Sequence, residues 1–137
     1  MDEFSITQHG KPLGESLYTI DIRYKIFATL ENNLVLDFGD LNGWTFKAFS
    51  GCTFKTGANC TFNTGGSCTF NTDWNCTFHT YHTCTFETGG GCSFSLYDID
   101  SCKFKNYDGH STIFDRIDNK RYVLSAELIK MLKIKNG

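Results

Sequence analysis

WTFKAFSG CTFKTGAN CTFNTGGS CTFNTDWN CTFHTYHT CTFETGGG CSFS, residues 44–95, repeats one motif every eight residues. A short fixed period is typical of stacked-repeat architectures, so this stretch decides the fold class. A cysteine opens six of the units, and a phenylalanine follows two places later. These residues are Cys52 and Phe54, Cys60 and Phe62, Cys68 and Phe70, Cys76 and Phe78, Cys84 and Phe86, and Cys92 and Phe94.

Alternation within the motif predicts which side chains are buried. Successive side chains of an extended segment point to opposite faces, so Cys and Phe share one face while Thr and the variable residue share the other. Free cysteine and phenylalanine are among the residues most often found inside proteins. We therefore expect a Phe/Cys core, with the first threonines and the variable residues in solvent. The remainder of each unit, such as Thr-Gly-Gly-Ser at 64–67, is typical of a turn.

One eight-residue loop encloses too little space for a Phe and a Cys, so two units are needed for each coil. We predict an all-β fold, a flattened β-solenoid with two parallel sheets and coils stacked about 4.8 Å apart. An alternative uses the same period to wind three chains into a triple-stranded β-helix, as in some phage spikes. A large Phe in every unit argues against that narrow shared core.

The chain outside the repeat is expected to cap the solenoid at both ends. We predict an N-terminal β cap over 1–43, the octapeptide solenoid over 44–117, and a C-terminal strand and capping helix over 118–137, all in one compact domain. Solenoids need such caps because an open end exposes core and unpaired backbone.

Within the N-terminal cap, residues 17–30 alternate between apolar and polar side chains, which predicts one half-buried strand. Counting back by eight from Trp44 places Leu36 and then Ala28 at the cysteine position. The same count places Phe38 and Leu30 at the phenylalanine position.

At the C-terminal end the period stretches. Cys102 follows Cys92 by ten residues, and Phe114 follows Phe104 by ten. This spacing predicts two enlarged units, at 101–108 and 111–117. Ser125 is the expected N-cap of a helix over 126–134 that lies across the open end.

The seven cysteines predict neither a cofactor nor a metal. Their number is odd, and the repeat places all but Cys102 at an inward position. Zinc sites use close pairs such as Cys-x-x-Cys, which are missing here. Buried structural thiols are the favoured interpretation, with disulfides and metal binding as alternatives.

Charge and hydropathy narrow the choice of partners. The formal net charge is −2, made of −4 over residues 1–43 (3 basic, 7 acidic), 0 over 44–95 (2 and 2) and +2 over 96–137 (8 and 6). No basic patch runs through the repeat, so a nucleic-acid partner is disfavoured. No apolar run approaches the length of a membrane span, and residues 1–16 do not have the pattern of a signal peptide. We expect no membrane association and a cytoplasmic location.

No catalytic set emerges from the sequence. His79 occupies an outward position, His82 lies in a turn, and Cys84 should point away from both. We predict a protein without enzymatic activity.

Aromatic residues interrupt turns otherwise built of Gly, Ser and Asn. With two units per coil, Phe49, Tyr81, His82 and Tyr97 fall along one edge and Trp74 along the other. Exposed Trp and Tyr are typical anchors of protein interfaces. These five residues are the predicted partner-binding residues; the alternative is that they fold back over the ends of the core.

The unit C-T-F-x-T-G-x-x resembles octapeptide repeats of small, mostly uncharacterised proteins from phages and gut bacteria. The resemblance covers residues 44–95 and implies a β-solenoid and a phage or mobile-element origin. Our hypothesis is a monomeric, non-catalytic module that docks on and inhibits a host defence protein. One alternative is a homotrimeric phage spike or fibre segment.

A second alternative is an ice- or surface-binding protein that uses its threonine ladders. The short period and the Thr- and Cys-rich composition resemble insect antifreeze proteins, which present Thr-x-Thr pairs. Here the second outward position holds other residues, for example Lys55, Asn63, His79 and Glu87.

Overall fold

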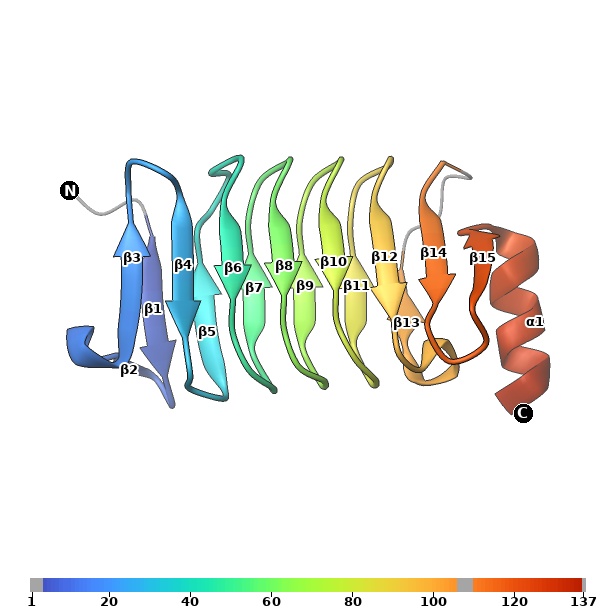
Figure 1. Ribbon diagram of the computed structural model, residues 1–137, viewed down its shortest axis with the longest axis horizontal. Helices are drawn as coiled ribbons and strands as arrows, with labels where there is room; N and C mark the ends of the chain where they lie inside the picture. The colour runs from blue at the N-terminus through green and yellow to red at the C-terminus, as the bar shows by residue number, and fades with distance from the viewer. Residues whose placement is uncertain (1–3, 106–109, 137) are drawn as a thin grey trace.

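The computed structural model is a β-solenoid of two sheets with one C-terminal helix (Figure 1). It describes residues 4–105 and 110–136, with side chains as far as Leu132. Sheet A has the strand order β13-β11-β9-β7-β5-β1-β2, and sheet B has the order β15-β14-β12-β10-β8-β6-β4-β3. Consecutive strands of the repeat alternate between the two sheets, so two units make one coil. The predicted fold class is confirmed.

The repeat strands are short, and those of each sheet run parallel. In sheet A they are β5 (Leu34–Asp37), β7 (Thr53–Lys55), β9 (Thr69–Asn71), β11 (Thr85–Glu87) and β13 (Lys103–Phe104). In sheet B they are β4 (Ile26–Thr29), β6 (Thr45–Lys47), β8 (Thr61–Asn63), β10 (Thr77–His79), β12 (Ser93–Leu96) and β14 (Thr112–Asp115). Equivalent residues of neighbouring coils face each other, as Phe54 faces Phe70.

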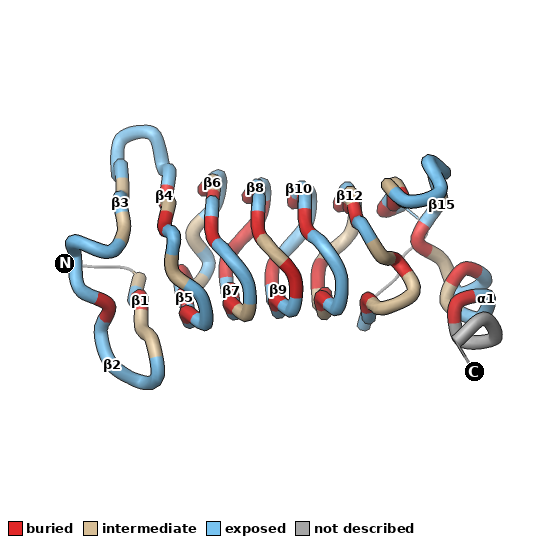
Figure 2. Tube along the Cα trace, turned by 60° about the horizontal axis from the view of Figure 1, so that its bottom comes forward, coloured by how far each residue is buried: buried red, intermediate tan, exposed pale blue. Residues whose placement is uncertain are grey.

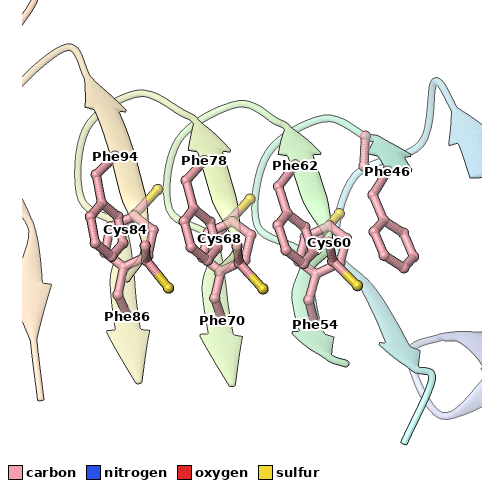
Figure 3. Close-up of a cluster of buried hydrophobic side chains, with 14 of the residues drawn as sticks. Phe46, Phe54, Cys60, Phe62, Cys68, Phe70, Phe78, Cys84, Phe86 and Phe94 are labelled. Carbon is pink, nitrogen blue, oxygen red and sulfur yellow. The ribbon is translucent and has the colours of Figure 1, made fainter. Parts of the chain in front are cut away.

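Phenylalanine rings fill the space between the sheets (Figure 3). Along sheet A the rings of Phe54 and Phe70 stack with centroids 5.1 Å apart and planes 5° apart. Across the core the rings of Phe54 and Phe62 meet edge to face, with centroids 5.2 Å apart. Both arrangements suit the ring quadrupole. The inward Phe/Cys face and the outward first threonines agree with the sequence prediction.

A third inward position went unrecognised in the sequence. The threonine that follows each variable residue is buried: Thr56, Thr64, Thr72, Thr80 and Thr88. The Thr64 hydroxyl donates to the carbonyl of Gly65 (3.2 Å) and lies beside the thiol of Cys68. The corner of each coil is thus packed by a threonine and is not an open turn.

The last residue of every unit turns the chain into the next strand with a left-handed backbone. The φ angles are +75° at Gly43, +72° at Gly51, +60° at Asn59, +57° at Ser67, +57° at Asn75, +61° at Thr83 and +69° at Gly91. Gly and Asn adopt this conformation at little cost, which explains their frequency at this position.

The segment 17–30 is a hairpin, so the prediction of one continuous strand is wrong. Strand β3 (Tyr18–Asp21) pairs antiparallel with β4. The turn between them is exposed (Figure 2), with Ile22 and Tyr24 60% and 64% exposed. The Asp21 carboxylate accepts a hydrogen bond from the backbone N–H of Tyr24 (3.0 Å), a local turn contact that the alternating pattern concealed.

The backward octad count also gave the wrong register. Phe27 faces Phe46, and Leu36 faces Phe54. Leu34 and Leu36 therefore take the Cys and Phe positions in place of Leu36 and Phe38, and Leu30 is exposed. The first coils are two to three residues longer than the later ones, so counting by eight drifts out of register.

Other segments complete the N-terminal cap. β1 (Ser5–Gln8) pairs antiparallel with β5 and with β2 (Lys11–Pro12), and a 3₁₀ turn, η1 (Glu15–Leu17), leads into β3. Phe38, which the count had placed in the repeat, packs against Trp44 with ring centroids 5.0 Å apart.

At the C-terminal end, Ile113 faces Phe94 and takes the inward position, so Phe114, ten residues after Phe104, points outward. Strand β15 (Lys120–Val123) pairs antiparallel with β14 and ends sheet B. A 3₁₀ turn, η2 (Ile99–Ser101), precedes β13, and the predicted unit 101–108 ends outside the described residues.

The capping helix α1 (Ala126–Asn136) confirms the predicted helix. The Ser125 hydroxyl accepts a hydrogen bond from the backbone N–H of Leu128 (3.2 Å), as an N-cap should. Leu128 and Leu132 are buried and join the core cluster, so the helix closes this end of the solenoid.

The cysteines form two buried ranks beside the phenylalanines. All seven are free. Each thiol lies between two turns and points at their carbonyls; for example, the Cys68 thiol is 3.4 Å from the carbonyl oxygen of Phe49 and 3.6 Å from that of Gly66. The ranks are Cys52, Cys68, Cys84 and Cys102 along sheet A, and Cys60, Cys76 and Cys92 along sheet B.

We expect Phe70→Ala to lower the free energy of unfolding by about 3–5 kcal/mol, because it removes a fully buried ring and leaves a cavity. The matched control Thr69→Ala, on the exposed face of the same strand, should cost within about 0.5 kcal/mol. Urea denaturation measures both. Equal losses would contradict the assignment of the two faces.

We also expect the thiols to be inert in the folded chain. All seven cysteines are at most 8% exposed, so a reagent in solution does not reach their sulfur atoms in the folded chain. Burial raises the pKa of Cys102 to about 12, whereas contact with the Cys68 thiol lowers the pKa of Cys52 to about 7, so the protection rests on burial and not on a shared pKa shift. At neutral pH, Ellman's reagent should therefore label all seven cysteines of the chain unfolded in guanidinium. In buffer it should label none of them in the time that it takes to label the free amino acid cysteine. Cys102, at the C-terminal end, should react first as guanidinium is added. Fast labelling of several thiols in buffer would contradict the closed core.

Candidate functional site

The edge at which the sheet B strands end carries large side chains in one line. Each lies three residues after the core residue of its strand, so parallel register stacks them coil upon coil. Gly65 in the same line adds no side chain. We call this line the aromatic edge; its members are Leu30, Phe49, Tyr81, Tyr97 and Arg116.

The rings of the aromatic edge are about half exposed, at 48% for Phe49, 44% for Tyr81 and 49% for Tyr97. Tyr81 and Tyr97 lie with ring centroids 6.1 Å apart, and the guanidinium of Arg116 sits 5.1 Å from the Tyr81 centroid. The rings therefore do not fold back over the core. They present apolar faces to solvent from a rigid backbone.

Arg116 is fixed by the turns beneath it. Its guanidinium donates to the carbonyls of Thr80 and Ser95 (2.5 Å each) and to the Ser95 hydroxyl (3.0 Å). Burial lowers the pKa of Arg116 from its ordinary value, which still leaves it charged at neutral pH. Burial, followed by the charge of Arg116, lowers the pKa of His79, which therefore stays neutral. The site holds one firmly positioned cation.

A groove adjoins the N-terminal part of this edge. It encloses about 500 Å³ between β3, β4 and β6. Leu17, Leu30 and Phe49 provide its apolar lining, and Lys47 and Asn63 provide polar groups at its side. Its lining therefore offers both apolar surface and a positive charge to a partner.

The turn that carries Tyr81 departs from the preferred turn chemistry. Residues 80–83 read Thr-Tyr-His-Thr where the preceding sheet B unit has Thr-Gly-Gly-Ser. Thr83 adopts φ +61°, a strained conformation for a β-branched residue. The ring of His82 lies over Gly66, where a Cβ would be 3.0 Å from it. Local stability is thus reduced at the point where the aromatic side chains appear.

Trp74 lies on the opposite edge, as the sequence predicted, and is 57% exposed. Its neighbours in the line are Ala58 and Gly90. A Cβ on Gly89 would lie 2.8 Å from the backbone nitrogen of Trp74, so the next turn packs closely against it. Trp74 is an isolated ring among small residues and forms no extended surface with other aromatics.

The outward faces of both sheets carry threonine ladders. Thr45, Thr61 and Thr77 face one another in sheet B, as do Thr53, Thr69 and Thr85 in sheet A. The neighbouring outward rank of sheet B holds Lys47, Asn63, His79 and Ser95. The paired threonine ranks of an ice-binding surface are therefore not formed.

The structure brings the predicted partner-binding residues together in part. Phe49, Tyr81, His82 and Tyr97 share one edge, whereas Trp74 is separate. Leu30 and Arg116 were missed; counting three residues from each strand's core residue, Phe27 and Ile113, would have found them. Cys84 is buried while His79 and His82 are exposed, so the three side chains do not form one site.

Within the described residues, no group of three or more His, Cys, Asp or Glu side chains is arranged to hold a metal ion. In the same residues no helix is long and apolar enough to cross a membrane.

We expect Thr83→Asn to raise the free energy of unfolding by about 1 kcal/mol, because Asn accepts the left-handed backbone more readily than Thr. The reciprocal change Asn59→Thr, at the equivalent left-handed position of another unit, should lower it by a similar amount. Urea denaturation of the two variants gives the comparison. A loss of stability in Thr83→Asn would contradict the strain at this turn.

Comparisons of the chain with protein-family models, with curated proteins and with solved structures found no significant match.

Proposed function

We propose that this chain is a non-catalytic protein-binding module whose aromatic edge docks on a partner protein. The observation that carries the proposal is the line of half-exposed apolar side chains held in register along one edge of a rigid solenoid. Isolated exposed apolar residues need no explanation, but several of them aligned along one edge, here interrupted at Gly65, are typical of an interface.

The scaffold suits such a role energetically. Ordering flexible side chains and loops opposes association, and here the backbone under the rings is already fixed by ladder hydrogen bonds and by Arg116. Tyrosine loses few rotatable bonds on binding and contributes a large contact area, which is why it is frequent among interface anchors.

The strained turn at 80–83 also supports the aromatic edge as the binding site. A Thr in the left-handed region costs of order 1–3 kcal/mol, whereas the other units place Gly, Asn or Ser there. Strain of this kind is characteristic of functional sites, because selection for binding tolerates it. It coincides here with the two aromatic substitutions Tyr81 and His82.

The biological setting proposed for the module rests on the octapeptide resemblance alone. We propose a phage or mobile-element protein that acts in the cytoplasm of a bacterial host and inhibits a host defence protein by occupying its surface. A homotrimeric fibre segment is the alternative, and light scattering separates the two: a monomer has a mass of 15.5 kDa.

The direct test is an interface measurement. The immobilised chain captures its partner from a bacterial lysate; the partner is identified and purified, and its Kd is measured by calorimetry. We expect the double variant Tyr81→Ser/Tyr97→Ser to weaken binding at least about tenfold, since each anchor contributes about 1–2 kcal/mol.

Trp74→Ser is the matched control, because it removes an equally exposed ring from the opposite edge. It should change Kd by less than about twofold, within the range of a residue outside the interface. Circular dichroism on all variants checks that folding is unchanged. A loss of binding in Trp74→Ser with none in the tyrosine variant would overturn the proposal.

A further inference from the structure

We infer that the surface recognised by this chain is acidic, and that it lies across the outer face of sheet B as well as on the aromatic edge. The inference rests on the proposed function and adds the chemistry of the partner. It starts from the distribution of charge over the two outer faces of the solenoid.

The outer face of sheet B lacks carboxylates from β4 to β14. Its outward positions are Ile26, Ala28, Thr45, Lys47, Thr61, Asn63, Thr77, His79, Ser93, Ser95, Thr112 and Phe114. Cations border this face at both ends: Lys47 beside the groove, and Arg116 and Arg121 at the C-terminal side.

Sheet A provides an internal comparison, because the same repeat builds it. Its outward rank runs Asp37, Lys55, Asn71, Glu87, Lys105, so charges of both signs alternate. Glu87 and Lys105 form an ion pair at 3.9 Å. The two faces thus differ in charge although their motif is shared.

The cations beside sheet B have no carboxylate partner among the described residues, since no described acid lies within ion-pair distance of Lys47, Arg116 or Arg121. Arg116 and Arg121 instead lie against the rings of Tyr81 and Phe114, at 5.1 and 5.0 Å from the centroids. Arg116 is also hydrogen-bonded to the turns beneath it, so Lys47 and Arg121 are the cations left for a carboxylate of a partner. Complementary charge gives specificity and a fast approach.

The polymer best matched to this surface is a polypeptide. Single-stranded nucleic acid needs a continuous basic track along its backbone, and here the cations stand at the two ends with Thr, Asn and Ser between them. A protein surface matches the combination of apolar edge, groove and separated cations, with carboxylates placed opposite Lys47 and Arg121.

The test is an NMR titration of the ¹⁵N-labelled full chain with synthetic probes. Three short peptides share the same Leu and Phe residues and carry Glu, Gln or Lys at the remaining positions; an oligothymidine of matched length is the fourth probe. We expect the Glu peptide to shift amide signals of β6, β8, β10 and β12. It should bind at least about tenfold more tightly than the Gln peptide, and added NaCl should weaken its binding.

Charge reversal locates the effect. The double variant Lys47→Glu/Arg121→Glu should weaken binding of the Glu peptide about tenfold. The control Lys55→Glu/Lys103→Glu makes the same change of charge on sheet A and should leave that binding nearly unchanged. All four substituted positions are exposed, so both variants should fold like the parent chain.

The outcomes separate this inference from the proposed function. Equal binding of the Gln and Glu peptides at the aromatic edge would overturn the acidic partner and leave the edge as an interface. Equal losses in the two charge variants, or no shifts with the Glu peptide, would also overturn the inference. Shifts on sheet B with oligothymidine alone would replace the protein partner by a nucleic acid.

Discussion

Stacked phenylalanine rings are the interaction on which the rest of the structure depends. In the regular coils, from Phe46 to Phe94, the centroids within each sheet repeat at 4.9–5.1 Å, for example between Phe62 and Phe78 and between Phe70 and Phe86. Hydrogen-bonded strands repeat at about 4.8 Å, so ring stacking and backbone pairing demand almost the same rise per coil. Neither interaction strains the other. That agreement allows three-residue strands, too short to be stable alone, to form a cooperative stack.

A fixed rise per coil places a strict demand on the turns. Each must reverse the chain within a few residues and lie flat on the turn below, where Gly57 and Gly89 have backbone atoms of the neighbouring turn within 3 Å of a hypothetical Cβ. Small residues and left-handed backbones meet this demand. A bulky side chain is accommodated only if it points outward, as the Tyr81 and Trp74 rings do. The same architecture that buries the phenylalanines of the strands therefore leaves an aromatic residue in a turn exposed to solvent.

The structural features that follow from the eight-residue period were predicted correctly from the sequence, whereas those of the segments that depart from the period were not. The two-unit coil, the inward Cys and Phe, and the helix capped by Ser125 all follow from local patterns. The hairpin at 17–30 was missed because its two strands continue one alternation through the turn at Ile22. The end coils differ in length from the regular ones, so Leu30 was assigned to the wrong place and Arg116 was overlooked. Register there is set by tertiary packing, which octad counting does not contain.

The same reasoning explains why two faces built from one motif differ in charge. Packing restricts the Cys, the Phe and the second Thr of each unit, but it leaves the variable outward residue free. Along sheet A that freedom gives alternating charges, which neutralise one another locally. Along sheet B the variable residues are Lys47, Asn63, His79 and Ser95. The edge next to them includes the strained left-handed backbone of Thr83. From β4 to β14 the outer face of sheet B thus lacks the carboxylates that sheet A carries, and it lies beside the turn in which a threonine takes the left-handed backbone. Both features are those that contact with a complementary partner surface, as proposed, would select.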